Sequence, residues 1–162
     1  MMYNKKRKED KLMDMLVNLY DLKESKEEEK TFQIQRILSP NIYLLEEFIK
    51  KYFHPGWASE AKAACYKANP TCFIATMDQK IVGFACYDAT AKGFFGPLGV
   101  ALEKRNQGIA KALVLRTLKA MKEDGYAYAI IGSVGENVIP FYEKVCQAVP
   151  IGGEKSVYQR MI

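Results

Sequence analysis

The spacing of apolar residues changes near residue 31, and this change divides the chain into two regions. Within Glu9–Leu22 apolar residues recur at helical intervals, which predicts an amphipathic helix. Residues 23–30 hold almost no apolar side chain, so we expect a solvated linker there. The sequence therefore predicts an N-terminal helical extension and linker over residues 1–30, followed by one main domain over residues 31–162. The apolar members of the predicted helix are Leu12, Leu16, Leu19 and Tyr20.

Alternating and striped apolar patterns in the main domain predict the element order β-α-α-β-β-β-α-β-α-β-β. This order is typical of a mixed α/β fold, with a largely antiparallel sheet flanked by helices. Asp78-Gln79 joins two strands in a predicted hairpin, Gly125 ends the longest helix, and Asn137 is expected to cap the last helix. The predicted strands are 31–38, 71–77, 80–87, 94–102, 126–132, 148–151 and 156–162, and the predicted helices are 42–53, 57–68, 107–124 and 138–146.

A positively charged turn opens the helix predicted over residues 107–124. It follows an apolar strand and reads Lys104-Arg105-Asn106-Gln107-Gly108-Ile109-Ala110-Lys111. The first N–H groups of a helix have no intrahelical partner, and the helix dipole places about half a positive charge there. Gly108 and Ala110 leave no bulk between these donors and an anion. The cations of the turn are unfavourable at a helix start unless an anion lies among them, so the turn is predicted to bind a diphosphate.

Composition narrows the classes of partner. The chain carries 24 basic and 19 acidic side chains, and its net charge of +5 fits a polyanionic ligand but is too small to indicate nucleic acid. No apolar stretch approaches the roughly 20 residues that cross a bilayer. The N-terminus does not resemble a secretory signal, so we expect no membrane partner and a cytoplasmic location. The four cysteines lack C-x-x-C spacing and there is one histidine, which predicts reduced, buried thiols and no metal site.

The turn resembles a known phosphate-binding motif. Arg105-Asn106-Gln107-Gly108-Ile109-Ala110 fits the Arg/Gln-x-x-Gly-x-Gly/Ala pattern of the GNAT superfamily of acetyl-CoA-dependent N-acetyltransferases. Gly99-Val100 precedes it on a strand, and Asn137 with Phe141-Tyr142-Glu143-Lys144 follows at the usual distance. The predicted element order also matches, so the resemblance covers residues 31–162. The chain looks most similar to a bacterial GNAT subgroup, on the segments Trp57–Glu60, Gly83–Thr90 and Gly125–Gly132.

The resemblance implies an acyltransferase that moves an acetyl group from acetyl-CoA to a primary amine, by direct attack in a ternary complex. It implies that pantetheine runs beside Leu98-Gly99-Val100, with a bulge at Gly99 and an oxyanion donor from Leu98 or Val100, typically worth about 3–4 kcal/mol. Tyr142 is the implied general acid. The implied cofactor-binding residues are Leu98, Gly99, Val100, Arg105, Asn106, Gln107, Gly108, Ile109, Ala110, Lys111, Asn137 and Tyr142.

The general base and the acceptor pocket are less constrained by the sequence. Asp88 and Glu136 are the carboxylates near strand ends, and either could take the proton from the amine; an ordered water relay is an equal alternative. Asp88 has the further alternative of only capping its loop. The acceptor, a small-molecule or peptide amine, is expected to contact aromatic residues near the cofactor strand. These are Trp57, Phe94 and Phe95.

Two other classes of function compete with acetyl transfer. A GNAT-fold protein that binds acyl-CoA as a sensor or scaffold, without transferring the acyl group, is the alternative that the fold leaves open. Lys92-Gly93-Phe94-Phe95-Gly96 resembles an RNA-recognition motif only in part, because Phe95 replaces a small residue and Pro97 interrupts the strand. We therefore expect no nucleic-acid partner. The N-terminal helix and the closing strands are expected to allow a homodimer.

Overall fold

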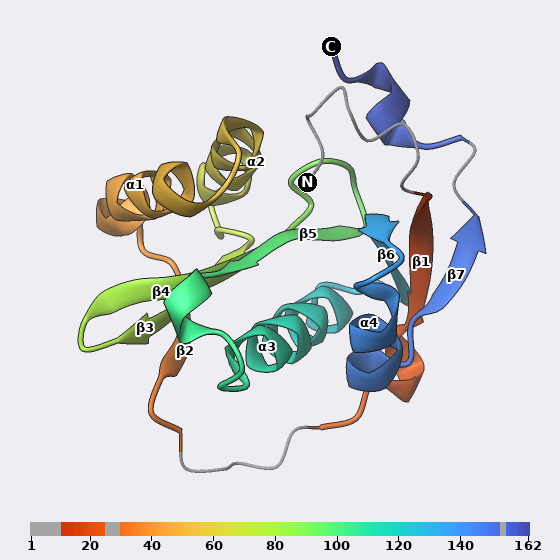
Figure 1. Ribbon diagram of the computed structural model, residues 1–162, viewed down its shortest axis with the longest axis horizontal. Helices are drawn as coiled ribbons and strands as arrows, with labels where there is room; N and C mark the ends of the chain where they lie inside the picture. Colours follow the sequence, from red (N-terminus) through yellow and green to blue (C-terminus); the bar gives the residue numbers. More distant parts are fainter. Residues whose placement is uncertain (1–10, 25–29, 153–154) are drawn as a thin grey trace.

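A seven-stranded sheet forms the centre of the molecule, in a computed structural model that describes residues 11–24, 30–152 and 155–162 (Figure 1). The strand order is β2-β3-β4-β5-β6-β1-β7. Neighbouring strands are antiparallel except β5 and β6, which are parallel. The fold is therefore the expected mixed α/β arrangement with a mostly antiparallel sheet. The strands are β1 (Leu12–Asn18), β2 (Gln33–Arg36), β3 (Cys72–Met77), β4 (Lys80–Tyr87), β5 (Phe94–Val100), β6 (Tyr128–Gly135) and β7 (Val149–Gly152).

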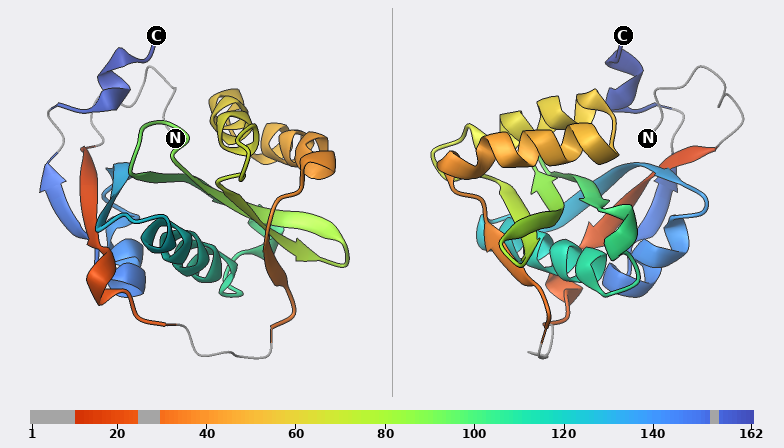
Figure 2. Two further views of the ribbon diagram at one scale, coloured as in Figure 1. Left: turned by 180° about the vertical axis from the view of Figure 1, so that it is seen from behind. Right: turned by 60° about the vertical axis from the view of Figure 1, so that its left-hand side comes forward.

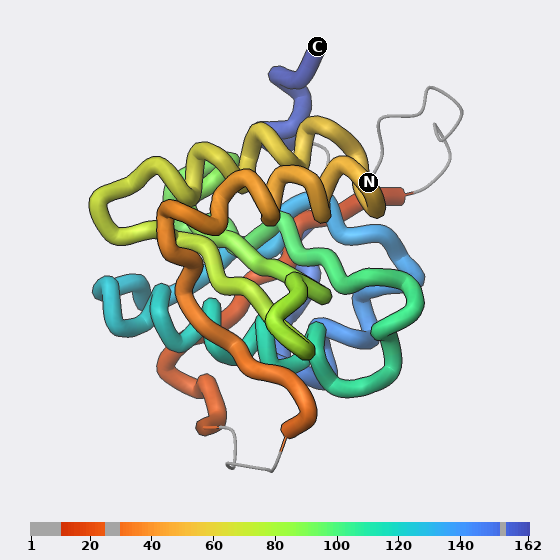
Figure 3. The backbone as a smooth tube through the Cα atoms, turned by 90° about the vertical axis from the view of Figure 1, so that its left-hand side faces the viewer, coloured from red at the N-terminus to blue at the C-terminus, as the bar shows by residue number. Residues whose placement is uncertain are grey.

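Helices cover both faces of this sheet. The helices α1 (Ile42–Tyr52) and α2 (Pro55–Cys65) lie side by side over one face, and α3 (Ile109–Glu123) and α4 (Ile139–Cys146) lie on the other (Figures 2 and 3). Alternate residues of a strand point to opposite faces, and β3 contributes to a separate hydrophobic core on each side. Within the described residues, no helix is both long enough and apolar enough to cross a membrane.

The predicted N-terminal helix is wrong. Leu12–Asn18 is strand β1, which lies between β6 and β7, and residues 9–10 lie outside the described residues. Met15, Val17 and Leu19 are fully buried, so burial follows the period of two of a strand. The helical spacing of the leucines is coincidental, because pairing with two neighbouring strands decides the conformation. The predicted division into residues 1–30 and 31–162 thus separates β1 from the other six strands of its sheet.

The end of the chain differs from the prediction in two further places. Residues 156–162 were expected to form a strand, but Val157–Arg160 is a 3₁₀ helix, η4, and β7 pairs with β1 instead. Helix α4 begins at Ile139 after Val138, without a side-chain cap, so the predicted capping by Asn137 is wrong. The two closing elements therefore do not form the expected strand pair.

Local turn signals in the middle of the chain are confirmed. Asp78 and Gln79 join β3 and β4 with φ angles of 48° and 59°, as a tight hairpin turn requires. Gly125 follows the end of α3 with a φ of 98°, a conformation that glycine adopts without steric cost. These elements fix the sheet and helix α3 that shape the site described below.

Candidate active site

A cleft opens where β5 and β6 separate. The two strands pair at Phe94–Ile130 and Phe95–Ile131, and beyond these residues they diverge. The cleft has a volume of about 1040 Å³ and is lined by both strands, by α2, by the start of α4 and by the C-terminal segment. Because the separated strands leave backbone groups of β5 without a sheet partner, this cleft offers hydrogen-bonding sites to an extended ligand.

The bulge in β5 lies at Gly96-Pro97 rather than at Gly99. Gly99 pairs regularly with Phe84, whereas the register shifts between the pairs Ala85–Leu98 and Tyr87–Phe95. Proline has no N–H to donate to the ladder, which suits it to a bulge. Gly99 has a different role: a Cβ there would lie 2.6 Å from the ring of Phe53. The glycine therefore allows an aromatic ring from the α1–α2 side to pack directly on the strand.

Two backbone N–H groups of β5 face the cleft. The Ala101 N–H donates to the Val82 carbonyl in β4, at 2.9 Å. Because N–H directions alternate along a strand, the N–H groups of Leu98 and Val100 point away from β4 and toward the diverging β6. Both residues line the cleft. The Val100 carbonyl on the same side accepts a bond from Arg105 Nε at 3.4 Å.

The charged turn adjoins the cleft at the start of α3. Gly108 precedes the helix with a φ of 81° and Asn106 has a φ of 63°. The first intrahelical bond runs from the Ala112 N–H to the Gly108 carbonyl, so the preceding N–H groups have no intrahelical acceptor. A Cβ at Gly108 would meet nothing within 4 Å, so the space beside this residue is open. The arrangement fits a diphosphate, with no acidic residue in the first turn to oppose it.

The side chains of the turn are placed unequally. Arg105 and Ala110 line the cleft and connect it to the turn. Gln107 and Lys111 are exposed, as are Asn106 and Gly108. Ile109 is 1 % exposed and packs in the core under the sheet, so its side chain is not available to a ligand.

Tyr142 and Asn137 reach the cleft from the region of α4. Tyr142 is buried, lines the cleft and packs edge-on against Phe95, with ring centroids 6.2 Å apart. Burial, together with nearby Cys146 and Tyr158, raises the pKa of Tyr142 well above its usual value, so the hydroxyl keeps its proton at neutral pH. Asn137 lines the cleft from the loop before α4.

Of the two carboxylates predicted as candidate bases, the structure places only one in the lining of the cleft. Asp88 does not line the cleft: one of its oxygens accepts the Gly93 N–H and the other accepts the Tyr126 hydroxyl, each at 2.7 Å. Asp88 therefore fixes its own loop, which is the alternative that the sequence analysis left open. Glu136 is exposed and lines the cleft beside β6.

A third carboxylate, Glu60, was missed by the sequence analysis. It lies half-buried on α2, lines the cleft, and accepts a hydrogen bond from the Thr90 hydroxyl at 2.6 Å. Burial raises the pKa of Glu60, and the bond from Thr90 offsets part of this effect. The signal in the sequence was its helical spacing, since Trp57 and Ala64 lie three and four residues away on the same face.

Aromatic rings form much of the remaining wall. Phe53 stacks on Trp57 with centroids 5.0 Å apart and planes at 24°, and both line the cleft. Phe95 lines it too, whereas Phe94 does not and packs near Tyr158. Tyr158, which was also missed, covers Gly132 so closely that a Cβ there would lie 2.5 Å from its ring. Because residues 156–162 were predicted as a strand, Tyr158 was not expected to line the cleft.

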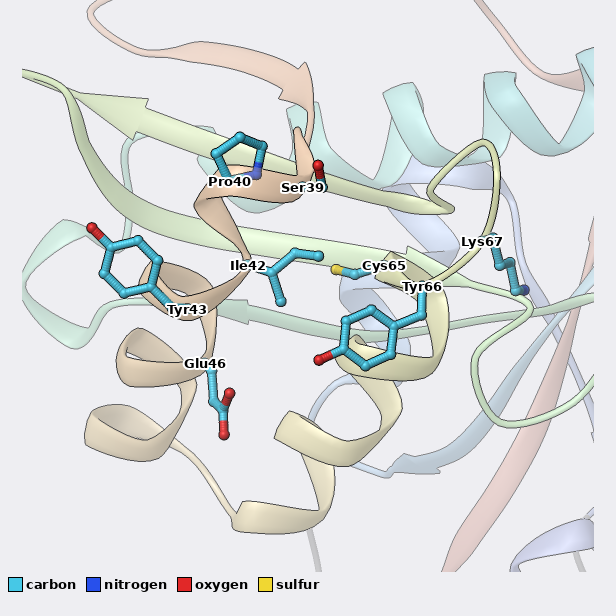
Figure 4. A pocket seen from close by; sticks show the side chains of 8 residues that line it. All are labelled: Ser39, Pro40, Ile42, Tyr43, Glu46, Cys65, Tyr66 and Lys67. Atoms are coloured by element: carbon cyan, nitrogen blue, oxygen red, sulfur yellow. The ribbon is translucent and has the colours of Figure 1, made fainter.

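A second hollow of about 570 Å³ lies between the start of α1 and the end of α2 (Figure 4). It holds none of the predicted site residues, and its carboxylate, Glu46, is paired with Lys50 at 2.7 Å and Lys62 at 2.9 Å. The cleft is therefore the better candidate. Among the described residues no group of three His, Cys, Asp or Glu side chains could hold a metal ion, and the four cysteines are free and buried.

The sequence matches one family model, that of the acetyltransferase (GNAT) family, over residues 31–147. This segment includes β5, the charged turn, α3, β6 and α4. No curated protein matches the chain.

Solved structures of this fold resemble the chain at low sequence identity. A GCN5-related glucosamine N-acetyltransferase region of a fungal multi-domain GH3 β-N-acetylglucosaminidase has a TM-score of 0.73 at 16% identity, covering 89% of this chain and 20% of that one. A GCN5-related N-acetyltransferase from Sphaerobacter thermophilus has a TM-score of 0.62 at 17% identity, covering 93% and 47%. One from Kribbella flavida has a TM-score of 0.57 at 16% identity, covering 90% and 59%. The chain thus spans between a fifth and three fifths of these proteins, and the likeness shows the fold.

Proposed function

The chain belongs to the GNAT family of acetyltransferases, and we propose that it transfers an acetyl group from acetyl-CoA to a primary amine. The observation that carries this proposal is the cleft between β5 and β6, which connects an open helix N-terminus to two backbone donors and a buried tyrosine. We propose that the amine attacks the thioester directly, with both substrates bound together. Holding them in this way supplies much of the acceleration, because the thioester is already activated.

The charged turn is proposed to bind the pyrophosphate of acetyl-CoA. The N–H groups at the start of α3 donate to phosphate oxygens, and Lys104, Arg105 and Lys111 supply positive charge. Asn106, Gln107, Gly108 and Ala110 contribute backbone in an open turn. Asn137 is proposed to hydrogen-bond the pantetheine arm from the opposite wall of the cleft.

The chemical step is proposed to take place beside β5. As the nitrogen forms its bond to the carbonyl carbon, negative charge gathers on the carbonyl oxygen, and the Leu98 or Val100 N–H stabilises it. The C–S bond then breaks, and Tyr142 donates its proton to the departing sulfur, for which a protonated hydroxyl is required. Of the two carboxylates expected as base, Glu136 lines the cleft; it accepts the proton from the amine directly or through water.

Calorimetric titration with acetyl-CoA tests the cofactor, and release of CoA in the presence of a panel of amines tests the reaction. We expect binding together with CoA release that depends on the amine. Binding without such release would favour the acyl-CoA sensor or scaffold, and the absence of binding at millimolar acetyl-CoA would overturn both.

Assembly and location stay predictions from the sequence. We propose a homodimer, which light scattering of the purified protein would test, although the N-terminal helix that suggested it is a strand. A cytoplasmic location is likewise proposed, and fractionation of cells that express the chain would test it.

A further inference from the structure

Building on the proposed acetyl transfer, we infer that Glu60 binds an ammonium group of the acceptor and selects cationic amines with an aromatic or aliphatic body. We call the part of the cleft formed by Phe53, Trp57, Glu60 and Thr90 the α2 end. Its residues come from the turn between α1 and α2, from α2 and from the loop between β4 and β5, and none of them belongs to the predicted cofactor site.

The geometry at the α2 end holds a carboxylate in one position. Thr90 donates its hydroxyl to one oxygen of Glu60 at 2.6 Å, which joins α2 to the β4–β5 loop. The loop is itself fixed, because Asp88 accepts bonds from Gly93 and Tyr126. A carboxylate has about four lone-pair sites, so a single donor leaves it capacity for a cation.

The charge of this wall favours a positively charged ligand. Among the described residues of the α2 end, Glu60 is the one ionisable side chain. The cations that line the cleft lie elsewhere: Arg105 is in the charged turn, and Lys11 precedes Leu12, which pairs with Gly135 of β6. An acceptor with its own carboxylate would therefore meet Glu60 without a cation on the same wall to offset the repulsion.

The rings beside Glu60 suit the body of an amine. Phe53 and Trp57 stack at 5.0 Å and present apolar surface, while aromatic faces also attract ammonium groups. Burial raises the pKa of Glu60, so its ionised form is costly in the empty cleft, and a bound ammonium relieves that cost.

Trp57 provides a direct test, because it is the only tryptophan of the chain. Its fluorescence is followed while phenethylamine or L-phenylalanine, which differ by a carboxylate, is added to the full chain. We expect phenethylamine to bind at least tenfold more tightly. Glu60→Gln should weaken phenethylamine binding about tenfold, or about 1.4 kcal/mol, and reduce the preference. Thr90→Val, which keeps the charge but releases the carboxylate, should weaken it about threefold.

The controls separate this role from folding and from the proposed reaction. Glu47→Gln, at an exposed position of α1, removes the same charge and should leave both affinities unchanged. Affinity for acetyl-CoA should stay within twofold in every variant. Equal binding of the two ligands, or an unchanged preference in folded Glu60→Gln, would show that Glu60 only joins α2 to the loop. Failure of CoA release with any amine, while the binding preference persists, would instead contradict the proposed transfer.

Discussion

The two ends of the cleft are built in different ways. The turn end, which we define as residues 98–111, is one continuous segment, and its donors are backbone N–H groups of β5 and α3. The α2 end is assembled from side chains distant in sequence, such as Glu60 and Thr90, which lie 30 residues apart. A backbone site depends on helix position and on small residues, whereas a side-chain site depends on tertiary packing. Substitutions should therefore affect acetyl-CoA binding at one end and amine binding at the other.

The largest effect is expected from Gly108→Glu at the turn end. The substitution places a carboxylate among the phosphate donors and a Cβ at a φ of 81°, so the Kd for acetyl-CoA should rise at least about 100-fold. Calorimetry measures this change. Gly125→Glu is the matched control, because it has a φ of 98° and open space at the other end of α3. Equal weakening by both variants would mean that backbone strain, rather than an anion site, explains the loss.

Tyr142→Phe should lower turnover about 100-fold while the Kd for acetyl-CoA stays unchanged, because it removes the proton donor and keeps the ring packed on Phe95 and Phe141. CoA release under saturating substrates measures the first quantity. Tyr87→Phe is the control: it removes a hydroxyl that donates to Asp124 at 2.5 Å, away from the cleft, and should leave turnover normal. Wild-type turnover in Tyr142→Phe would assign the tyrosine to the core alone.

Gly99→Ala tests whether the two ends are independent, since Gly99 belongs to β5 and contacts Phe53. The added methyl group would displace the ring, at a cost of about 1–3 kcal/mol in the free energy of unfolding. Because the ring stacks on Trp57, phenethylamine binding should weaken more than acetyl-CoA binding. Thermal unfolding and the fluorescence titration measure both effects. Adding Phe53→Leu should recover part of the stability, and strictly additive losses would contradict the proposed clash.

Local turns of the backbone were predicted from the sequence better than the side-chain contacts that form the α2 end. Gly108, Gly125 and Asp78-Gln79 act through local backbone preferences, which are visible in a few neighbouring residues. Strand β1 was misread because its pairing with β6 and β7 overrides a helix-like spacing of leucines. Glu60 and Tyr158 reach the cleft through the packing of α2 and of the C-terminal segment. Helical spacing places Glu60 on the same face of α2 as Trp57, but it does not show what that face contacts.

The smallest effect concerns the stability of the protein without ligand, which is lowered when Glu60 is ionised in the folded state. Because burial raises the pKa of Glu60 above 4.5, the folded state holds its proton more tightly than the unfolded state. The stability that this contributes is fully present below pH 4.5 and is lost as pH rises through the folded-state pKa. Glu60→Gln does not titrate, so its Tm relative to the wild type should rise over this window and then stay constant. At neutral pH, saturating phenethylamine should raise the Tm of the wild type above that of Glu60→Gln, since the ammonium stabilises only the ionised carboxylate. A Tm difference that is independent of both pH and amine would mean that burial does not destabilise the ionised form of Glu60 and that Glu60 does not bind the ammonium group.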